Sequence, residues 1–372
     1  MTMKKLFVFL WSMAISAAAL ASEGKFSFNS GNWASDGEKT KVEKHLGQES
    51  LYLQRGHLLY REAEMQDGIL EVDIAPDPAR GMAGIIFRHD GKNNYEELYI
   101  RQGKSGQPDA LQYTPVFNGS SSWQLYAEHQ SRQVFKPGEW IHLKVEVRGA
   151  MAKVYLDHSD TPAMVIPNLR LGSKSGKFGL WTLNGAHFSN FNFIPLNIAS
   201  APTQTVIADA PANIISEWQV SQPFLVKDVQ PEVWPKVQQL KWESLPTDAQ
   251  GLLNIAQYRS KQEAEAFESN TDDMVWVKLE LNSAKEQTKK LYFEYSNKAH
   301  VLVNGQPIFF GDNSFRAKNN LFRGEIDKTL RTNAIYLPLK KGQNILLVAL
   351  SSRANGWGIM GRFDNMEGIS IK

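Results

Sequence analysis

The sequence predicts an all-β protein with two β-sandwich (jelly-roll) domains in tandem. Three observations predict this fold class. Apolar and polar residues alternate with a period of two in many short stretches, and Gly, Pro, Asn and Asp fill the gaps between them. One longer stretch, residues 195–213, is rich in Ala, Pro and Thr and has Asp209 as its single charge. Period two indicates strands with one buried face, and many short strands at regular spacing are typical of sandwiches.

The composition limits the class of protein. A chain of 372 residues suggests about two domains, and 42% hydrophobic with 22% charged residues is a globular profile. Runs of like charge do not exceed the pairs Lys289-Lys290 and Lys340-Lys341. The sequence therefore lacks the basic patch that binding to nucleic acid requires.

The first 21 residues are typical of a secretory signal peptide. Lys4 and Lys5 precede an apolar run from Leu6 to Leu20, and Ala19-Leu20-Ala21 supplies the small residues of a cleavage site. A run of 15 residues is too short to span a bilayer, so we expect cleavage after Ala21 and a periplasmic or secreted protein with no membrane span. Cleavage removes two lysines and changes the formal net charge from +2 to 0. Because the chain has no cysteine, its core alone must hold it together.

Residues 24–194 are expected to form the first sandwich. The stretch "GILEVDIAP" alternates Leu70, Val72 and Ile74 with two acids, and "EWIHLKVEVRG" continues the same pattern. "AKVYLD" and "HFSNFNFIP" add further strands. Residues 195–213 are predicted to be a linker, because Pro favours an extended chain and little in the segment can be packed.

Residues 214–372 are expected to form the second sandwich. "VWVKLEL" and "KLYFEYS" alternate as strands, and Asn304-Gly305 stands between two apolar runs as a hairpin signal. "IYLPLKKGQNILLVAL" is predicted to be another hairpin that turns at Lys341 to Asn344. The opening stretch "PEVWPKVQQLKWESL" is ambiguous and would accommodate a helical turn.

Several of these elements in order resemble a known family. "GILEVDI", "AGIIFR", "GEWIHLKVEVRGAMAKVYLD", "SGKFGLWT" and "FSNFNF" are similar to a concanavalin A-like lectin/glucanase sandwich of the laminin G-like and 3-keto-disaccharide hydrolase-like branch. In the second half, "VLVNGQPIFFGDN", "IYLPLKKGQNILLVAL" and "NGWGIMGRF" resemble a galactose-binding-like jelly roll. The first resemblance implies a sugar-related role. The second implies a non-catalytic sandwich that binds a sugar or supports its neighbour, with Trp357 in a structural role.

The resemblance to glucanases can be tested on residues. Those enzymes carry Glu-x-Asp-x-x-Glu on one strand, with the two glutamates as nucleophile and acid/base. Glu71 and Asp73 stand at the first two places, but Pro76 occupies the third. We therefore expect no hydrolysis by that motif and interpret both acids as the polar face of a strand. Acid–base candidates for a keto-sugar hydrolase occur outside any matched motif, at Glu96, Glu97, Asp109, His89 and His187.

Signatures of zinc proteases, serine hydrolases and phosphate-binding loops are missing from the sequence. A structural calcium ion is a further alternative, because loop oxygens bind calcium in such sandwiches. Turn chemistry explains the same residues without a metal, and it is the interpretation we favour for Asp77, Asp157, Asp160 and Asp312.

Residues 95–126 combine aromatic rings with Gly, Pro, Ser, Asn and Gln. Aromatic rings suit the C–H faces of a sugar, and amide, carboxyl and guanidinium groups suit its hydroxyls. The rings could instead pin the long excursion to the sheet. We expect some rings between Tyr113 and Tyr126 to face solvent in one cleft, and we predict as ligand-binding residues Arg101, Asp109, Gln112, Tyr113, Asn118, Trp123 and Gln124.

The sequence thus predicts an exported, lectin-like protein that binds a carbohydrate or glycoconjugate. The alternatives are a glycoside or keto-sugar hydrolase that acts at the concave face of the first sandwich, and a scaffold or partner-binding module without a sugar site. The sequence names neither the sugar nor the oligomeric state.

Overall fold

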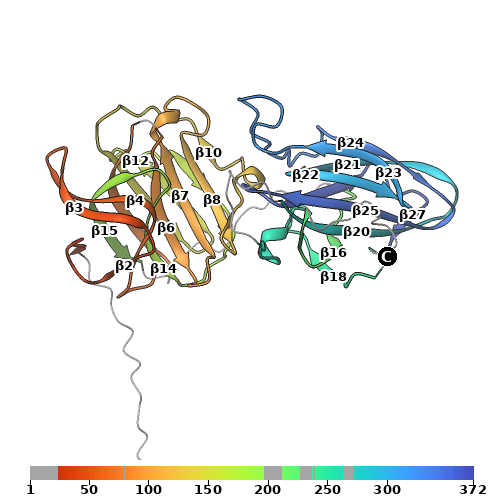
Figure 1. Cartoon of the computed structure of the whole chain (residues 1–372), viewed down its shortest axis with the longest axis horizontal. Helices are drawn as coiled ribbons and strands as arrows, with labels where there is room; N and C mark the ends of the chain where they lie inside the picture. Colours follow the sequence, from red (N-terminus) through yellow and green to blue (C-terminus); the bar gives the residue numbers. More distant parts are fainter. Residues whose placement is uncertain (1–23, 79, 197–211, 227–236, 238, 263–271) are drawn as a thin grey trace, which may run out of the picture.

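The computed structural model describes residues 24–78, 80–196, 212–226, 237, 239–262 and 272–372. Strands make up almost all of the described secondary structure, which confirms the all-β prediction. Two β domains lie end to end along the longest axis of the molecule (Figure 1). The predicted signal peptide lies outside the described residues, as do residues 197–211 of the predicted linker.

The first domain contains two sheets that share one long strand, β4 (Gln48–Tyr60). Sheet A has the strand order β4-β15-β5-β11-β12-β13, and β3 and β1 pair with β4 and β15. Its further strands are β1 (Gly24–Lys25), β3 (Glu38–His45), β5 (Gly68–Pro76), β11 (Ile141–Arg148), β12 (Met151–Leu156), β13 (Met164–Ile166) and β15 (Ala186–Pro195).

Sheet B has the order β10-β8-β7-β6-β14-β4, with β2 on β4 and β9 on β8. Two 3₁₀ turns interrupt the aromatic-rich segment, η1 (Gln102–Lys104) and η2 (Trp123–Leu125). The strands of sheet B besides β4 are β2 (Trp33–Ser35), β6 (Met82–His89), β7 (Tyr95–Arg101), β8 (Leu111–Phe117), β9 (Ser120–Ser121), β10 (Gln130–Ser131) and β14 (Lys177–Thr182).

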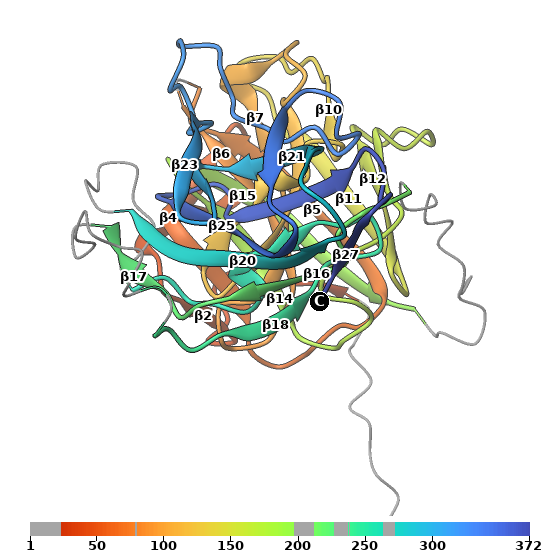
Figure 2. The same cartoon turned by 90° about the vertical axis from the view of Figure 1, so that its right-hand side faces the viewer.

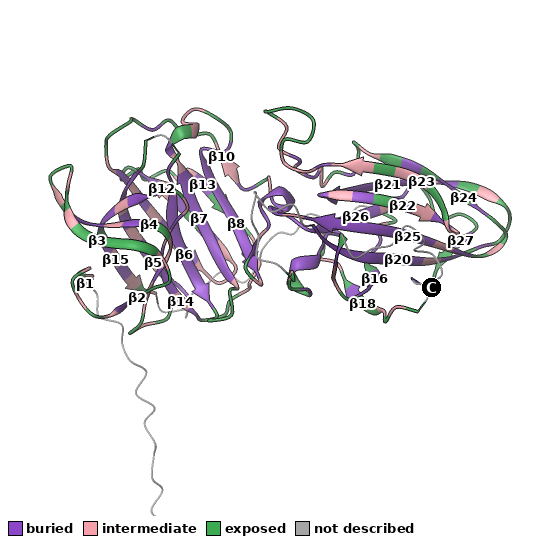
Figure 3. Cartoon of the chain, viewed as in Figure 1, coloured by how far each residue is buried: buried purple, intermediate pink, exposed green. Residues whose placement is uncertain are grey.

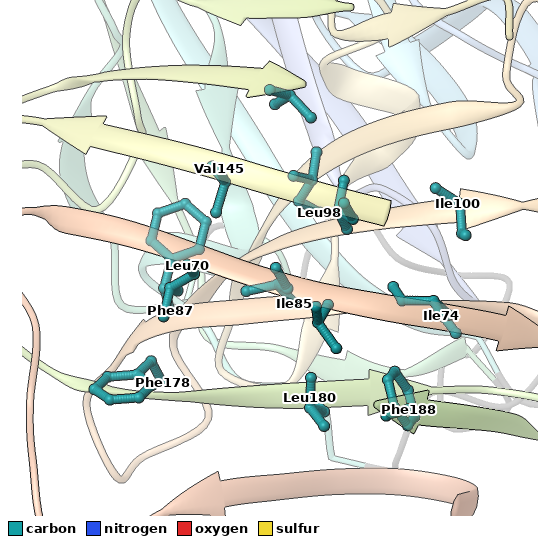
Figure 4. Close-up of a cluster of buried hydrophobic side chains, with 14 of the residues drawn as sticks. Leu70, Ile74, Ile85, Phe87, Leu98, Ile100, Val145, Phe178, Leu180 and Phe188 are labelled. Carbon is teal, nitrogen blue, oxygen red and sulfur yellow. The ribbon is translucent and has the colours of Figure 1, made fainter. Parts of the chain in front are cut away.

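The core of the first domain lies between these two sheets. Strand β5 alternates buried and half-buried residues as the sequence predicts, and Leu70 and Ile74 are fully buried. Figure 4 shows them with Val145 of sheet A and with side chains of sheet B that include Phe87 and Leu98. Every strand that enters this core therefore has a second face, which points away from it.

The second domain is also a sandwich of two sheets (Figure 2). Sheet C has the order β18-β16-β20-β25-β22-β23 with β17 and β27 on β20, and sheet D has the order β19-β26-β21-β24. A 3₁₀ turn, η4 (Ile255–Gln257), follows β19. The strands are β16 (Glu217–Val220), β17 (Phe224–Leu225), β18 (Glu243–Pro246), β19 (Leu253–Asn254), β20 (Asp273–Ser283), β21 (Gln287–Ser296), β22 (Lys298–Val303), β23 (Gln306–Asp312), β24 (Ala334–Leu339), β25 (Gly342–Ser352), β26 (Gly358–Phe363) and β27 (Ile369–Ile371).

One of the two predicted hairpins is confirmed and the other is wrong. Asn304 and Gly305, both at positive φ, join β22 to β23, which pair with each other. The stretch around Lys341 instead carries the chain from β24 in sheet D to β25 in sheet C. The Asn344 side chain holds this corner through hydrogen bonds with the Lys340 N–H and carbonyl. A tight turn with Gly thus joins two sheets here, because β24 pairs with β21 and β25 pairs with β20.

The two domains meet through the aromatic-rich segment of the first. The Gln124 side chain inserts into the second domain, where its Oε1 accepts hydrogen bonds from Ser296 Oγ (3.1 Å) and Asn297 Nδ2 (2.9 Å). Its Nε2 donates to the Arg323 carbonyl at 2.6 Å. Gln124 is completely buried, so these bonds replace every contact with water that its amide loses.

Glycines of the second domain make room for this insertion. A Cβ atom on Gly358 would lie 2.9 Å from Leu125 Cδ1, and one on Gly356 would lie 3.2 Å from Gln124 Cβ. Trp357, which stands between these glycines, is 1% exposed and donates its indole N–H to the Leu350 carbonyl. The structural role that we expected for Trp357 is therefore confirmed.

An apolar cluster and ion pairs complete the contact between domains. The cluster joins residues of both domains, and it comprises Leu125, Tyr126, Leu252, Ile326, Leu330 and Met360. Arg170 pairs with Asp248 at 3.1 Å, and Lys328 pairs with Glu128. Because these contacts combine apolar burial with satisfied polar groups, the interface resembles a small core.

We predict that replacing Gln124 by alanine weakens the whole chain. The change leaves Ser296 Oγ, Asn297 Nδ2 and the Arg323 carbonyl buried without this partner. It should lower the free energy of unfolding by about 1–3 kcal/mol, measured by urea denaturation. The matched control is Gln107→Ala, because Gln107 is exposed in a turn of the same segment. Equal midpoints for the two variants would contradict the docking role.

Candidate functional site

The outer face of sheet B, the face turned away from the core, gathers the groups with unusual chemistry. Antiparallel register aligns one row of side chains across its strands. The row continues across six strands, in the order His57, Trp181, Gly84, Tyr99, Gln112 and Gln130. The strands β6, β7 and β8 are buried for most of their length (Figure 3), so the side chains on this face have little contact with bulk water along them.

Two rings meet over a glycine in this row. Gly84 lies in register between Trp181 and Tyr99, and the two ring centroids are 5.3 Å apart. A Cβ atom on Gly84 would collide with the Leu98 carbonyl oxygen. Trp181 is half-buried while Tyr99 is only 3% exposed. The glycine therefore permits a continuous aromatic surface, with the indole as its more accessible part.

Glu97 lies in the next row, between Ile86 and Thr114 of the neighbouring strands. It is 4% exposed, and its carboxyl has no hydrogen-bond or ion-pair partner among the described residues. Burial raises the pKa of Glu97 to about 8. At neutral pH the group is therefore mainly a neutral acid, which can donate one hydrogen bond and accept others.

A chain of hydrogen bonds reaches the same face from its far edge. His57 Nδ1 lies 2.9 Å from Asp36 Oδ2, and His57 Nε2 lies 3.0 Å from the Tyr95 hydroxyl. The side-chain hydrogen bond with His57 is the largest cause that lowers the pKa of Asp36. The ring of His89 stacks on that of Tyr95 at 5.3 Å. The ionised Asp36 thus orients an imidazole and a phenol toward the aromatic surface.

The opposite edge carries a charged cluster to which both domains contribute. Asp109 accepts hydrogen bonds from Arg101 and from Arg323 of the second domain. Arg323 Nε also donates to Glu325 at 2.6 Å, and Glu325 accepts from Gln130 at 2.7 Å. We call these five residues the interdomain charge cluster. It lies beside Gln112, whose amide N and O are both buried without a partner in the described structure.

Tyr99 connects the aromatic surface to this cluster. Burial is the main cause that raises the pKa of its phenol far above the ordinary value. Smaller contributions come from Glu97 and from three members of the interdomain charge cluster, Arg101, Arg323 and Asp109. The phenol therefore stays neutral, and it lies within electrostatic reach of both parts of the face.

The seven residues predicted to bind a ligand separate into two groups. Arg101, Asp109 and Gln112 lie together at the edge of the outer face of sheet B. The others make structural contacts: Tyr113 donates to Glu96 inside the core, Asn118 donates to the Ala256 carbonyl, Trp123 donates to Asn355, and Gln124 inserts into the second domain.

The expectation of rings that face solvent is wrong for this segment. Tyr113 is fully buried, Tyr126 is 2% exposed and Trp123 is 9% exposed. They pack in the core or against the second domain, because the excursion after β7 is the docking surface. A ligand role for the seven residues stays a prediction, and it is best supported for Arg101, whose side chain is 17% exposed.

Sequence reasoning missed Trp181, His57 and Tyr95, and it named Glu97 only among scattered acids. Alternation was the available signal, because Tyr95, Glu97, Tyr99 and Arg101 occupy every second place of one strand. Of these four outward places, only that of Glu97 holds a carboxylate. A retaining glucanase needs two carboxylates across the bond, so this strand lacks that catalytic pair.

Two of the four aspartates considered as calcium ligands make hydrogen bonds typical of turns. Asp157 accepts a hydrogen bond from the His142 N–H, and Asp312 accepts one from the Ser314 N–H, as turn residues do. Within the described residues, no group of three or more His, Asp or Glu side chains is placed to hold a metal ion. The same part of the chain contains no helix with the length and apolar character needed to cross a membrane.

A comparison with protein families finds a match to the first domain. Residues 22–193 match the 3-keto-alpha-glucoside-1,2-lyase-like domain. The matched residues contain the two-sheet sandwich of the first domain. The second β domain lies outside the matched residues. No curated protein matches the chain.

Solved structures with some likeness to the chain include sugar-related proteins. Carbohydrate-binding module CBM66 from Bacillus subtilis is 21% identical, with a TM-score of 0.35, and the match covers 44% of this chain and 95% of that one. A Bacillus licheniformis β-glucanase is 12% identical, with a TM-score of 0.31 and coverage of 47% and 97%. A family 35 carbohydrate-binding module from an environmental isolate is 21% identical, with a TM-score of 0.20 and coverage of 26% and 69%. These distant likenesses assign no role to any residue.

The raised pKa of Glu97 leads to a prediction about how the stability of the protein depends on pH. Its folded-state pKa of about 8 lies above the ordinary value of 4.5, so the folded chain retains a proton that the unfolded chain releases. The contribution of Glu97 to the free energy of unfolding is therefore fully present at low pH. It decreases as pH rises from about 5 to 8, by up to about 1.4 kcal/mol per pH unit. Glu97→Gln should flatten this decrease, measured as the free energy of unfolding in urea at several pH values.

The control for this experiment is Glu62→Gln, because Glu62 is exposed. That variant should keep the slope of the wild type between pH 5 and 8. A slope for Glu97→Gln that equals the slope of the control would show that Glu97 titrates normally in the folded chain.

Proposed function

We propose that this protein is an exported carbohydrate-binding protein whose sugar lies on the outer face of sheet B. One observation carries the proposal: the buried, neutral carboxyl of Glu97, which has no hydrogen-bond or ion-pair partner among the described residues, lies one row from an aromatic surface. Burial of a polar group without a hydrogen bond is costly, so a site of this kind favours a ligand that supplies the missing bond. The periplasmic or secreted location belongs to the same proposal and rests on the predicted signal peptide.

The chemistry of the face suits a sugar. A hydroxyl group both donates and accepts, which matches the protonated Glu97, and the apolar C–H face of a sugar ring matches the indole of Trp181. Arg101 and Arg323 of the interdomain charge cluster are 17% and 23% exposed, so they can reach further hydroxyls at the edge. In this proposal the second domain is a galactose-binding-like accessory sandwich that supplies Arg323.

A second candidate function is cleavage of a keto-sugar, and the Asp36–His57–Tyr95 chain favours it. The matched family is described as lyase-like. In a 1,2-elimination, a base removes the proton on C2 beside the C3 carbonyl, a C1–C2 double bond forms, and the C1–O bond breaks. The leaving oxygen then takes a proton from an acid. On this face Glu97 is a carboxyl that keeps its proton at neutral pH and is the candidate acid, and His57 is the candidate base.

Binding is tested by replacing the accessible ring. Trp181→Ala should reduce affinity for a sugar found on a glycan array by at least tenfold, because it removes the apolar platform, and a tenfold change equals about 1.4 kcal/mol. Isothermal titration calorimetry gives the dissociation constants. Trp140→Ala is the control, because Trp140 is half-buried at the sheet A side, where it donates to the Leu46 carbonyl.

Three results of this experiment bear on the proposal. Loss of affinity for Trp181→Ala but not for Trp140→Ala supports the site on sheet B. Unchanged affinity in both variants would mean that the sugar binds elsewhere on the molecule. Absence of any bound glycan overturns the binding proposal and favours the scaffold alternative.

The lyase candidate has its own assay. The full mature protein is incubated with p-nitrophenyl 3-keto-α-glucoside, and release of nitrophenolate is followed by absorbance. If the elimination occurs, Glu97→Gln should lower the rate at least tenfold, as is typical for loss of a general acid. Release by the wild type at the rate of buffer alone would contradict this second function.

A further inference from the structure

The opposite sheet of the first domain carries a separate pocket. It has a volume of about 120 Å³ and opens on the outer face of sheet A, away from sheet B. Strands β5, β11 and β12 form its floor, and the turn after β12 forms its wall. Its lining consists of Glu71, His142, Lys144, Tyr155, His158, Ser159 and Asp160.

Two sequence motifs with no role in the proposed function meet in this pocket. Glu71 belongs to the incomplete glucanase-like stretch "EVDIAP", and His158 to Asp160 belong to "LDHSD". The motifs are more than 80 residues apart, and the pairing of β5 with β11 and of β11 with β12 brings them together. The polar face of β5, which we interpreted as merely solvated, is thus one side of a pocket.

Asp73 orients the imidazole of His142. His142 Nδ1 lies 2.7 Å from Asp73 Oδ1, and Asn190 Nδ2 donates to Asp73 Oδ2 at 2.7 Å. Burial acts to raise the pKa of Asp73, but these hydrogen bonds outweigh it and leave the pKa below its ordinary value. Because an ionised carboxylate only accepts, Nδ1 of His142 is the donor, and Nε2 is left for the pocket.

The remaining groups offer both donors and acceptors. The His158 ring stacks on His142 with centroids 3.8 Å apart. The Lys144 ammonium lies 4.6 Å from the centre of the Tyr155 ring. Glu71 accepts a hydrogen bond from Asn192 at 3.2 Å and keeps acceptor capacity, while Asp160 has no partner among the described residues.

This mixture indicates the class of ligand. One ammonium group faces two carboxylates, so an inorganic anion would meet repulsion from Glu71 and Asp160. A neutral hydroxyl donates to a carboxylate or to His142 Nε2 and accepts from an ammonium at the same time. The volume equals that of about four water molecules, which suits one edge of a single sugar ring.

We propose that the sheet A pocket is a second binding site, which takes one neutral, hydroxyl-rich sugar unit. The site shares no residue with the face of sheet B, so its existence does not depend on the proposed function. Together the two sites would let one domain hold two sugar units on opposite faces, which raises the effective affinity for a branched or repeating glycan.

Nuclear magnetic resonance of the histidine side chains tests this site directly. The full mature protein is titrated with methyl α-D-glucoside, methyl α-D-galactoside and methyl α-D-mannoside in turn. At least one of them should shift the imidazole signals of His142 and His158 in a saturable way. Inorganic phosphate serves as the anionic probe and should not shift them saturably.

Matched variants define the groups that bind. Glu71→Gln and His158→Ala should each weaken the saturable shift of the remaining signals at least fivefold, while Trp181→Ala should leave it unchanged. Lys153→Ala is the control, because Lys153 is exposed two residues before Tyr155 on β12 and lies outside the pocket. Unfolding midpoints in urea verify that each variant folds.

The outcomes separate this site from the one on sheet B. Saturable shifts that survive Trp181→Ala and are lost in Glu71→Gln support a second sugar site, even if the proposed site on sheet B fails its own test. Saturation by phosphate with no response to any glycoside would show that the pocket binds an anion rather than a sugar, and it would overturn the proposal. Linear shifts with all probes would overturn it as well.

Discussion

The insertion of Gln124 and Leu125 beside Trp357 is the contact on which the arrangement of the molecule depends. It is possible because Gly356 and Gly358 lack side chains, and the amide of Gln124 replaces its water with three hydrogen bonds across the interface. A hydrophobic contact alone would allow the two sandwiches to slide. A buried amide with several fixed partners permits one orientation, because any other leaves polar groups unsatisfied.

This orientation determines how the outer face of sheet B is built. It brings Arg323 of the second domain to Asp109 and thereby closes one edge of the face with charged groups. Glu97 on this face is 4% exposed, and its burial keeps its proton at neutral pH. The docking contact and the charged edge of the candidate site are linked in this way, although the residues that make them lie on different strands.

Much of the fold could be predicted from the sequence, but the candidate site largely could not. Alternation in β5, β11 and β20 specifies strands and their buried faces, because burial on one side imposes a period of two. The hairpin predicted at Lys341 is wrong because a turn with Gly has the same sequence pattern whether it joins two strands of one sheet or strands of two different sheets. The aromatic-rich segment misleads for a related reason: rings and amides that dock a domain have the composition of rings and amides that hold a sugar. Glu97 could be placed on an outward face by alternation, but its cover depends on contacts distant in sequence.

The two outer faces of the first sandwich show how the environment of a carboxyl group determines its role. Glu97 on sheet B has no hydrogen-bond partner within the described part of the chain and is mainly neutral at pH 7, so it offers a hydrogen to a ligand. Asp73 on sheet A is held by His142 and Asn190 and is ionised, so it serves to orient an imidazole rather than to meet a ligand itself. Binding that needs the neutral Glu97 must weaken as pH rises past about 8, because ionisation both removes the donor and creates a buried charge. The sheet A pocket contains no such buried acid among its lining residues, so the same rise in pH should leave it able to bind. Different responses to alkaline pH would therefore distinguish the two faces without any substitution.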